Sequence, residues 1–175
     1  MEAFGVKFRI ERQDLFPSLV ATFDALKRAK DSGDFGEPDR WAELLAPEAR
    51  AHFDWPGEQE GQEQAVLRAS HPVAIAAPAD ALGREWDFPS LLAAIENGEF
   101  SLLEIARLPD GTAELRINPE AYPYGGIGSF IALVEAHGMY VLGVNEYGRY
   151  QPREELQEAL VASTPTRRRP WWRFW

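Results

Sequence analysis

Residues 122–150 constrain the fold more than any other part of the chain. They read YPYGGIGSFIALVEAHGMYVLGVNEYGRY. A glycine-rich turn precedes an apolar stretch with helical spacing, and a glycine favourable to a helix end precedes an almost continuous apolar run. We therefore predict a helix over residues 129–137, a helix stop at Gly138 and a strand over residues 139–144.

The N-terminal part of the chain predicts one strand and two helices. Residues 4–10 alternate apolar and polar side chains, which is typical of a half-buried strand. Pro17 favours a helix start, and the apolar stripe that follows it consists of Leu19, Val20, Phe23 and Leu26. A second helix is expected over residues 39–53, with an interruption at Pro47.

The second half of the chain predicts a β-α-β-β-α-β order. Residues 72–77 are expected to form the first strand, and a helix starts near Pro89. A hairpin follows, with strands over residues 100–108 and 113–117 joined by a tight Pro-Asp-Gly turn.

This order indicates an α+β fold, with a small antiparallel or mixed sheet and helices on one face. Residues 72–145 match the split β-α-β pattern of ferredoxin-like domains. We expect a single domain over residues 1–166. It comprises a strand and helices in 1–70, the β-α-β-β-α-β core in 71–150, and a helix in 151–166 that starts at Pro152. Residues 167–175 form a basic, tryptophan-rich tail.

The charge of the chain argues against direct nucleic-acid binding. The 175 residues carry a formal net charge of −10, whereas phosphate binding needs clustered basic side chains. Cysteine is absent, which excludes disulfides and thiolate metal sites. The N-terminal sequence lacks a signal-peptide pattern, and no apolar run reaches the roughly 20 residues that span a bilayer, so we expect a cytoplasmic protein.

Three segments contain candidate binding residues. The glycine-rich turn opens a helix, where backbone N–H groups either hold an anion or simply permit a tight connection. Its residues are Gly125, Gly126, Gly128 and Ser129. Tyrosine and arginine are enriched at binding hot spots, and they recur on both sides of the central helix. This predicted partner-binding surface consists of Tyr122, Tyr124, Glu146, Tyr147, Arg149 and Tyr150.

The tail is the third segment, and two interpretations of it remain open. Its anchor residues are Arg167, Arg168, Arg169, Trp171, Trp172 and Trp175. Arginine attracts anionic headgroups and tryptophan favours the bilayer interface, which indicates membrane contact. The alternative is a docked tail, which either folds back on the acidic body of its own chain or binds another subunit. Residues 1–166 contain 14 basic and 28 acidic side chains.

The sequence predicts no catalytic residues, metal site or cofactor. None of the three histidines lies in a zinc-binding motif, and Ser129 has no nucleophile-elbow context. Glu135 and His137 would serve acid–base chemistry only if the fold brought them together in a pocket.

Our first functional hypothesis is therefore a non-catalytic, acidic protein-binding module of the toxin-neutralising immunity type, whose partner is a basic protein. The alternatives are a small ligand-binding domain or enzyme at residues 125–128, and a peripheral membrane protein held by its tail. The sequence does not determine the oligomeric state.

Overall fold

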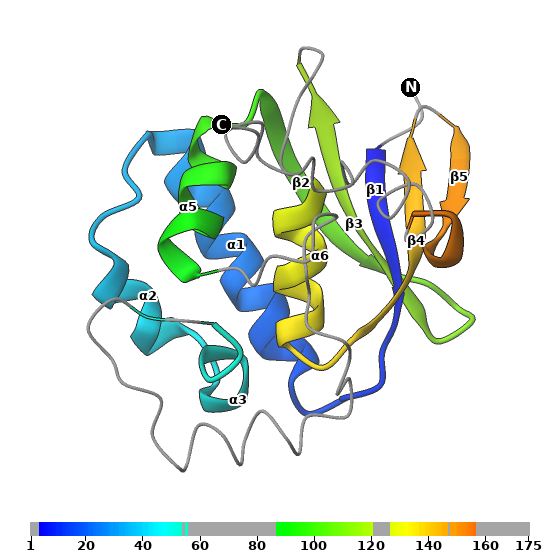
Figure 1. Cartoon of the computed structure of the whole chain (residues 1–175), viewed down its shortest axis with the longest axis horizontal. Coiled ribbons are helices and arrows are strands. Elements are labelled where there is room, and N and C mark those ends of the chain that lie inside the picture. Colours follow the sequence, from blue (N-terminus) through cyan, green and yellow to red (C-terminus); the bar gives the residue numbers. More distant parts are fainter. Residues whose placement is uncertain (1–3, 54, 56–86, 121–126, 147, 157–175) are drawn as a thin grey trace, which may run out of the picture.

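The computed structural model describes residues 4–53, 55, 87–120, 127–146 and 148–156, and the fold is given for these residues (Figure 1). They form, in chain order, β1 (Phe4–Arg9), α1 (Phe16–Ser32), α2 (Pro38–Leu44), α3 (Pro47–Arg50), α5 (Phe88–Asn97), β2 (Phe100–Arg107), β3 (Thr112–Pro119), α6 (Ile127–Ala136), β4 (Tyr140–Glu146) and β5 (Arg149–Pro152).

The strands form one antiparallel sheet in the order β2-β3-β1-β4-β5. Because β1 lies antiparallel to β3, and β3 to β2, the strands β1 and β2 run parallel with β3 inserted between them. In the same way β3 and β4 run parallel on either side of β1. The sheet therefore contains two interlocked split β-α-β units. The α+β fold class predicted from the sequence is confirmed.

The first strand of this pattern differs from the prediction. We expected residues 72–77 in that position, and they lie outside the described residues. The strand that pairs with β3 and β4 is instead β1, which the sequence placed in a separate N-terminal part. The split β-α-β pattern thus begins at residue 4, and α1 belongs to it.

The expected helix start at Pro152 is also corrected. Arg149–Pro152 pairs with β4 as the edge strand β5, and the chain becomes helical at residues 153–156. Pro152 is tolerated because it ends an edge strand, where its missing N–H breaks no inner ladder. The rest of the expected helix lies outside the described residues.

One face of the sheet carries the core. Phe4, Val6 and Phe8 of β1 are fully or almost fully buried, as their alternation predicts. Figure 1 shows α1, α5 and α6 on the same side of the sheet. The buried face of α1 contains Leu19, Phe23 and Leu26. The predicted second helix is divided at Pro47 into α2 and α3.

Helix α6 lies at the centre of the molecule. Residues 129, 130 and 132–136 are all buried, so the helix is enclosed on nearly every side, as expected of a helix that is apolar all round. Gly138 follows with a φ of 75°, a left-handed conformation that suits glycine and ends the helix where the sequence predicted.

The opposite face of the sheet is polar. On this face Arg116 of β3 donates to Glu104 of β2 at 2.9 Å and to Glu114 of its own strand at 2.8 Å. Lys7 of β1 lies 3.6 Å from Asp110. These ion pairs occupy much of the charge on this face.

Candidate functional site

A hollow of about 360 Å³ lies where α1 ends, α5 ends and β2 begins. Lys30, Asp31, Gly33 and Phe35 line it from α1 and the turn after it. Glu96 and Gly98 come from the end of α5, Phe100 and Ser101 from β2, and Glu120 from the residue after β3. The end of α5 and the start of β2 are continuous in the chain, so the hollow combines three segments that are distant in sequence: residues 30–35, residues 96–101 and Glu120.

Lys30 fastens these segments together. Its ammonium group donates to the carbonyl oxygens of Ile95 at 2.8 Å, Glu96 at 3.2 Å and Gly98 at 2.8 Å. Two of these carbonyls belong to the last turn of α5, whose hydrogen-bond acceptors have no partner within the helix, and the third belongs to Gly98, which follows the helix. The Lys30 nitrogen also lies 4.7 Å from the ring centroid of Phe100. Burial lowers the pKa of Lys30, although Glu120 and Glu96 oppose this shift.

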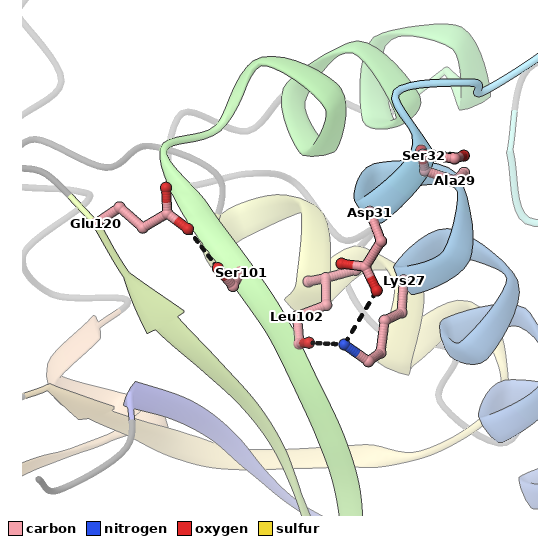
Figure 2. A network of polar contacts seen from close by, with 7 residues as sticks. All are labelled: Lys27, Ala29, Asp31, Ser32, Ser101, Leu102 and Glu120. Carbon is pink, nitrogen blue, oxygen red and sulfur yellow. Dashed lines mark hydrogen bonds and ion pairs between the residues drawn. The ribbon is translucent and has the colours of Figure 1, made fainter.

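Lys27, one turn earlier, fastens α1 to the edge of the sheet. Figure 2 shows its ammonium group between the carbonyl oxygen of Leu102, at 2.8 Å, and the carboxylate of Asp31, at 3.3 Å. Because β2 is an edge strand, this carbonyl would otherwise face solvent. The same region of β2 contains a bulge between Leu102 and Glu104.

Three carboxylates remain around the hollow. Asp31 contacts Lys27, and Glu120 accepts a hydrogen bond from Ser101 (Figure 2). Glu96 has no ion pair within the described part of the chain. Since the three donors of the Lys30 ammonium face carbonyl oxygens, none remains for an anion. The chemistry of the hollow therefore favours a cationic group.

The predicted partner-binding surface is described only in part. Arg149 and Tyr150 are exposed on β5, and Glu146 at the end of β4 is half-buried. The Tyr150 ring lies across β4 at Gly143, where a Cβ would meet the Tyr150 hydroxyl at 2.7 Å. Tyr122, Tyr124 and Tyr147 lie outside the described residues, so their convergence with Tyr150 stays a prediction.

The predicted anion-binding turn and tail are mostly outside the described residues as well. This holds for Gly125, Gly126 and all of residues 167–175. Within the described part, Gly128 belongs to the first turn of α6 and Ser129 is fully buried. Neither interpretation of the tail is tested.

Glu135 and His137 are both buried, but their side chains have different partners. Glu135 is 1% exposed and forms an ion pair with Arg153, which follows β5. Burial raises the pKa of Glu135, and the neighbouring Arg153 opposes the shift. The Nδ1 atom of His137 donates to the carbonyl oxygen of Leu133 at 2.8 Å. Each group thus has a contact that stabilises α6.

The sequence analysis missed the hollow. Lys27 and Lys30 lie near the C-terminal end of their own helix, where positive charge is favourable without any further partner. Their actual acceptors lie 65 to 75 residues later, on α5 and β2. The run of carboxylates after Lys30 is visible in the sequence and indicates an acidic surface. The sequence does not indicate which later residues lie beside this run.

No protein-family model matches this chain, and no curated protein or solved structure gives a significant match. Among the described helices, none combines the length and the apolar character needed to cross a membrane. In the same ranges no group of three or more histidine, aspartate or glutamate side chains is placed to hold a metal ion.

Proposed function

We propose that this chain is a protein-binding module that recognises a basic partner protein through the acidic surface at the end of α1. This surface is defined as residues 31–43 together with the end of α5. The observation that carries the proposal is the inward engagement of Lys27 and Lys30, which leaves the neighbouring carboxylates as the outward charge.

The charge of residues 31–43 is strongly one-sided. Asp31, Asp34, Glu37, Asp39 and Glu43 are all exposed, whereas Arg40 is the only basic side chain in the segment. Clustered charge of one sign raises the association rate of an oppositely charged protein and disfavours partners of like charge. An acidic surface of this kind therefore suits a basic protein.

Neutralisation of a toxin is the specific role that we favour. A nuclease or other nucleic-acid-binding toxin carries a basic surface, and an immunity protein blocks that surface with an acidic surface of its own. The predicted cytoplasmic location is part of the same proposal. Arg149 and Tyr150 on β5 provide a second, separate surface, and a test must distinguish the two.

The test begins with affinity capture from a native lysate and identification of the stoichiometric partner. The affinity of the purified pair is then measured by calorimetry at about 50 and 300 mM salt. We expect a basic partner whose affinity falls with salt, because salt screens exposed charges. The combined substitution Asp34→Asn, Glu37→Gln, Asp39→Asn and Glu43→Gln should weaken the affinity at 50 mM salt and reduce its dependence on salt.

The matched comparison is the variant Arg149→Ala with Tyr150→Ala, which alters the other edge of the sheet. If only this variant loses the partner, the acidic surface is not the recognition surface. If the partner is acidic, or if its affinity does not respond to salt, the proposal is wrong.

A further inference from the structure

We propose that the hollow between α1, α5 and β2 receives one arginine side chain of the partner. This inference rests on the proposed function and specifies its central contact. The occupant is a guanidinium group on an exposed loop or helix of a basic protein. Its charge would face Asp31, Glu96 and Glu120.

The balance of donors and acceptors is the first argument. The Lys30 ammonium has three donors, and three backbone carbonyl oxygens accept them. The groups still available to an occupant are carboxylate oxygens, which only accept hydrogen bonds when ionised. One lysine and three carboxylates give the lining a net charge of −2, and the ion pair of Asp31 with the neighbouring Lys27 reduces the charge of the site to −1. An occupant must therefore bring positive charge and several N–H donors.

The shape of the hollow is the second argument. At about 360 Å³ it lies at the lower end of the range of ligand pockets, which suits a single side chain better than a large cofactor. Gly98 contributes to this shape, because a Cβ there would meet the Phe100 ring at 2.0 Å. The absence of a side chain at Gly98 lets the ring lie against the end of α5.

Arginine fits these features better than lysine. Its planar guanidinium has five donors and contacts more than one carboxylate at once, and it is more weakly hydrated than an ammonium group. Arginine is also enriched at the centres of protein interfaces, whereas lysine is depleted there. We therefore assign the hollow to arginine.

The test is a titration of the full chain with N-acetyl-arginine amide, followed by NMR. The backbone amides of Asp31, Gly98 and Ser101 report on the hollow. We expect saturable shifts at these amides, and none with N-acetyl-citrulline amide, which has nearly the same shape without the charge. N-acetyl-lysine amide should bind more weakly than the arginine probe.

The variant Glu96→Gln with Glu120→Gln should bind the arginine probe about fivefold more weakly, as expected when two exposed ion pairs are lost. Glutamine at position 120 still accepts a hydrogen bond from Ser101, so the fold should be preserved. The control is Glu37→Gln with Glu43→Gln, which changes the net charge equally but lies outside the hollow. A well-dispersed spectrum confirms the fold of each variant.

The outcomes separate this inference from the proposed function. Equal shifts with arginine and citrulline, or equal losses in the two variants, overturn the assignment of the hollow. If the captured partner binds the wild type and Glu96→Gln with Glu120→Gln equally well, the hollow is not the anchor, although the proposed function stands. Saturable arginine binding without any basic partner supports the hollow and contradicts the proposed function.

Discussion

The two edges of the sheet are protected in opposite ways. The β2 edge is long, and α1 covers part of it by directing Lys27 to the Leu102 carbonyl oxygen. The β5 edge has only four residues, ends at a proline and leaves Tyr150 47% exposed. Both solutions are known ways to prevent unwanted strand pairing. The comparison shows that protection of the β2 edge uses the basic side chain of Lys27, and Lys30 is likewise turned inward, which leaves an acidic surface beside the edge.

The edges also differ in how they are joined to the core. Near β2 the connection consists of lysines that bind backbone carbonyls. Beyond β5 it is the ion pair between Arg153 and the buried Glu135, and Arg153 also lies 5.3 Å from the ring centroid of Tyr140. Loss of a partner should therefore be most costly at the β5 end, where the remaining charge is buried.

The largest effect is expected from Arg153→Ala. It leaves Glu135 buried without its cation, which should cost about 3 kcal/mol at neutral pH. Burial raises the pKa of Glu135, so its contribution to stability is fully present below its ordinary pKa of 4.5 and is lost as pH rises. The variant should raise this pKa further, and the loss of stability should therefore shrink as pH falls from 7 towards 4.5.

Urea denaturation at both pH values measures this difference. Arg149→Ala is the matched control, because Arg149 is an exposed arginine on β5, the strand that directly precedes Arg153. A loss for Arg153→Ala that does not depend on pH would show that the ion pair is not its cause.

A smaller effect is expected from Lys30→Met, which keeps the apolar stem but removes the ammonium donor from the carbonyl oxygens of Ile95 and Glu96. The Gly98 carbonyl oxygen still accepts from the Phe100 N–H. The loss should be about 2 kcal/mol, the range for hydrogen bonds to charged groups. Thermal and urea denaturation measure it, with the exposed Arg28→Met as the control, for which a change below about 0.5 kcal/mol is expected. If the two variants are equally stable, the contacts of Lys30 do not stabilise this edge of the sheet.

The smallest effect on stability is expected from Lys27→Met, because water can replace the lost donor at the Leu102 carbonyl. We expect about 1 kcal/mol. The more informative result is self-association through the β2 edge, measured by light scattering over a range of protein concentrations.

The control for this edge is Asp31→Asn, which weakens the ion pair of Lys27 but keeps its donor to Leu102. If both variants remain equally monomeric, Lys27 does not protect the edge.

Local patterns in the sequence predicted most elements of this fold. The alternation of Phe4, Val6 and Phe8 indicated β1, and prolines near the helix starts indicated α1 and α5. Gly138 indicated the end of α6. The edge strand β5 was not predicted, because Arg149–Pro152 has no apolar alternation and Pro152 resembles a helix start.

The partners of these elements were much less predictable. The central place of β1 depends on pairing with strands more than one hundred residues away, which no local pattern contains. The same applies to Lys30 and to Glu135, which we considered only as an acid–base or surface group. Its burial follows from the enclosure of α6, and its charge is tolerated because Arg153 comes from a later segment.

The central position of β1 has a consequence for the order of synthesis. Phe4 pairs with Ile117, and Val6 pairs with Val144, so both neighbours of β1 are made more than one hundred residues after it. At ~5–20 residues per second, roughly ten seconds pass between the synthesis of β1 and that of β3, the earlier of its two neighbours. During this interval the apolar row of β1 has no sheet partner. Strand β1 is therefore synthesised well before the strands that enclose it.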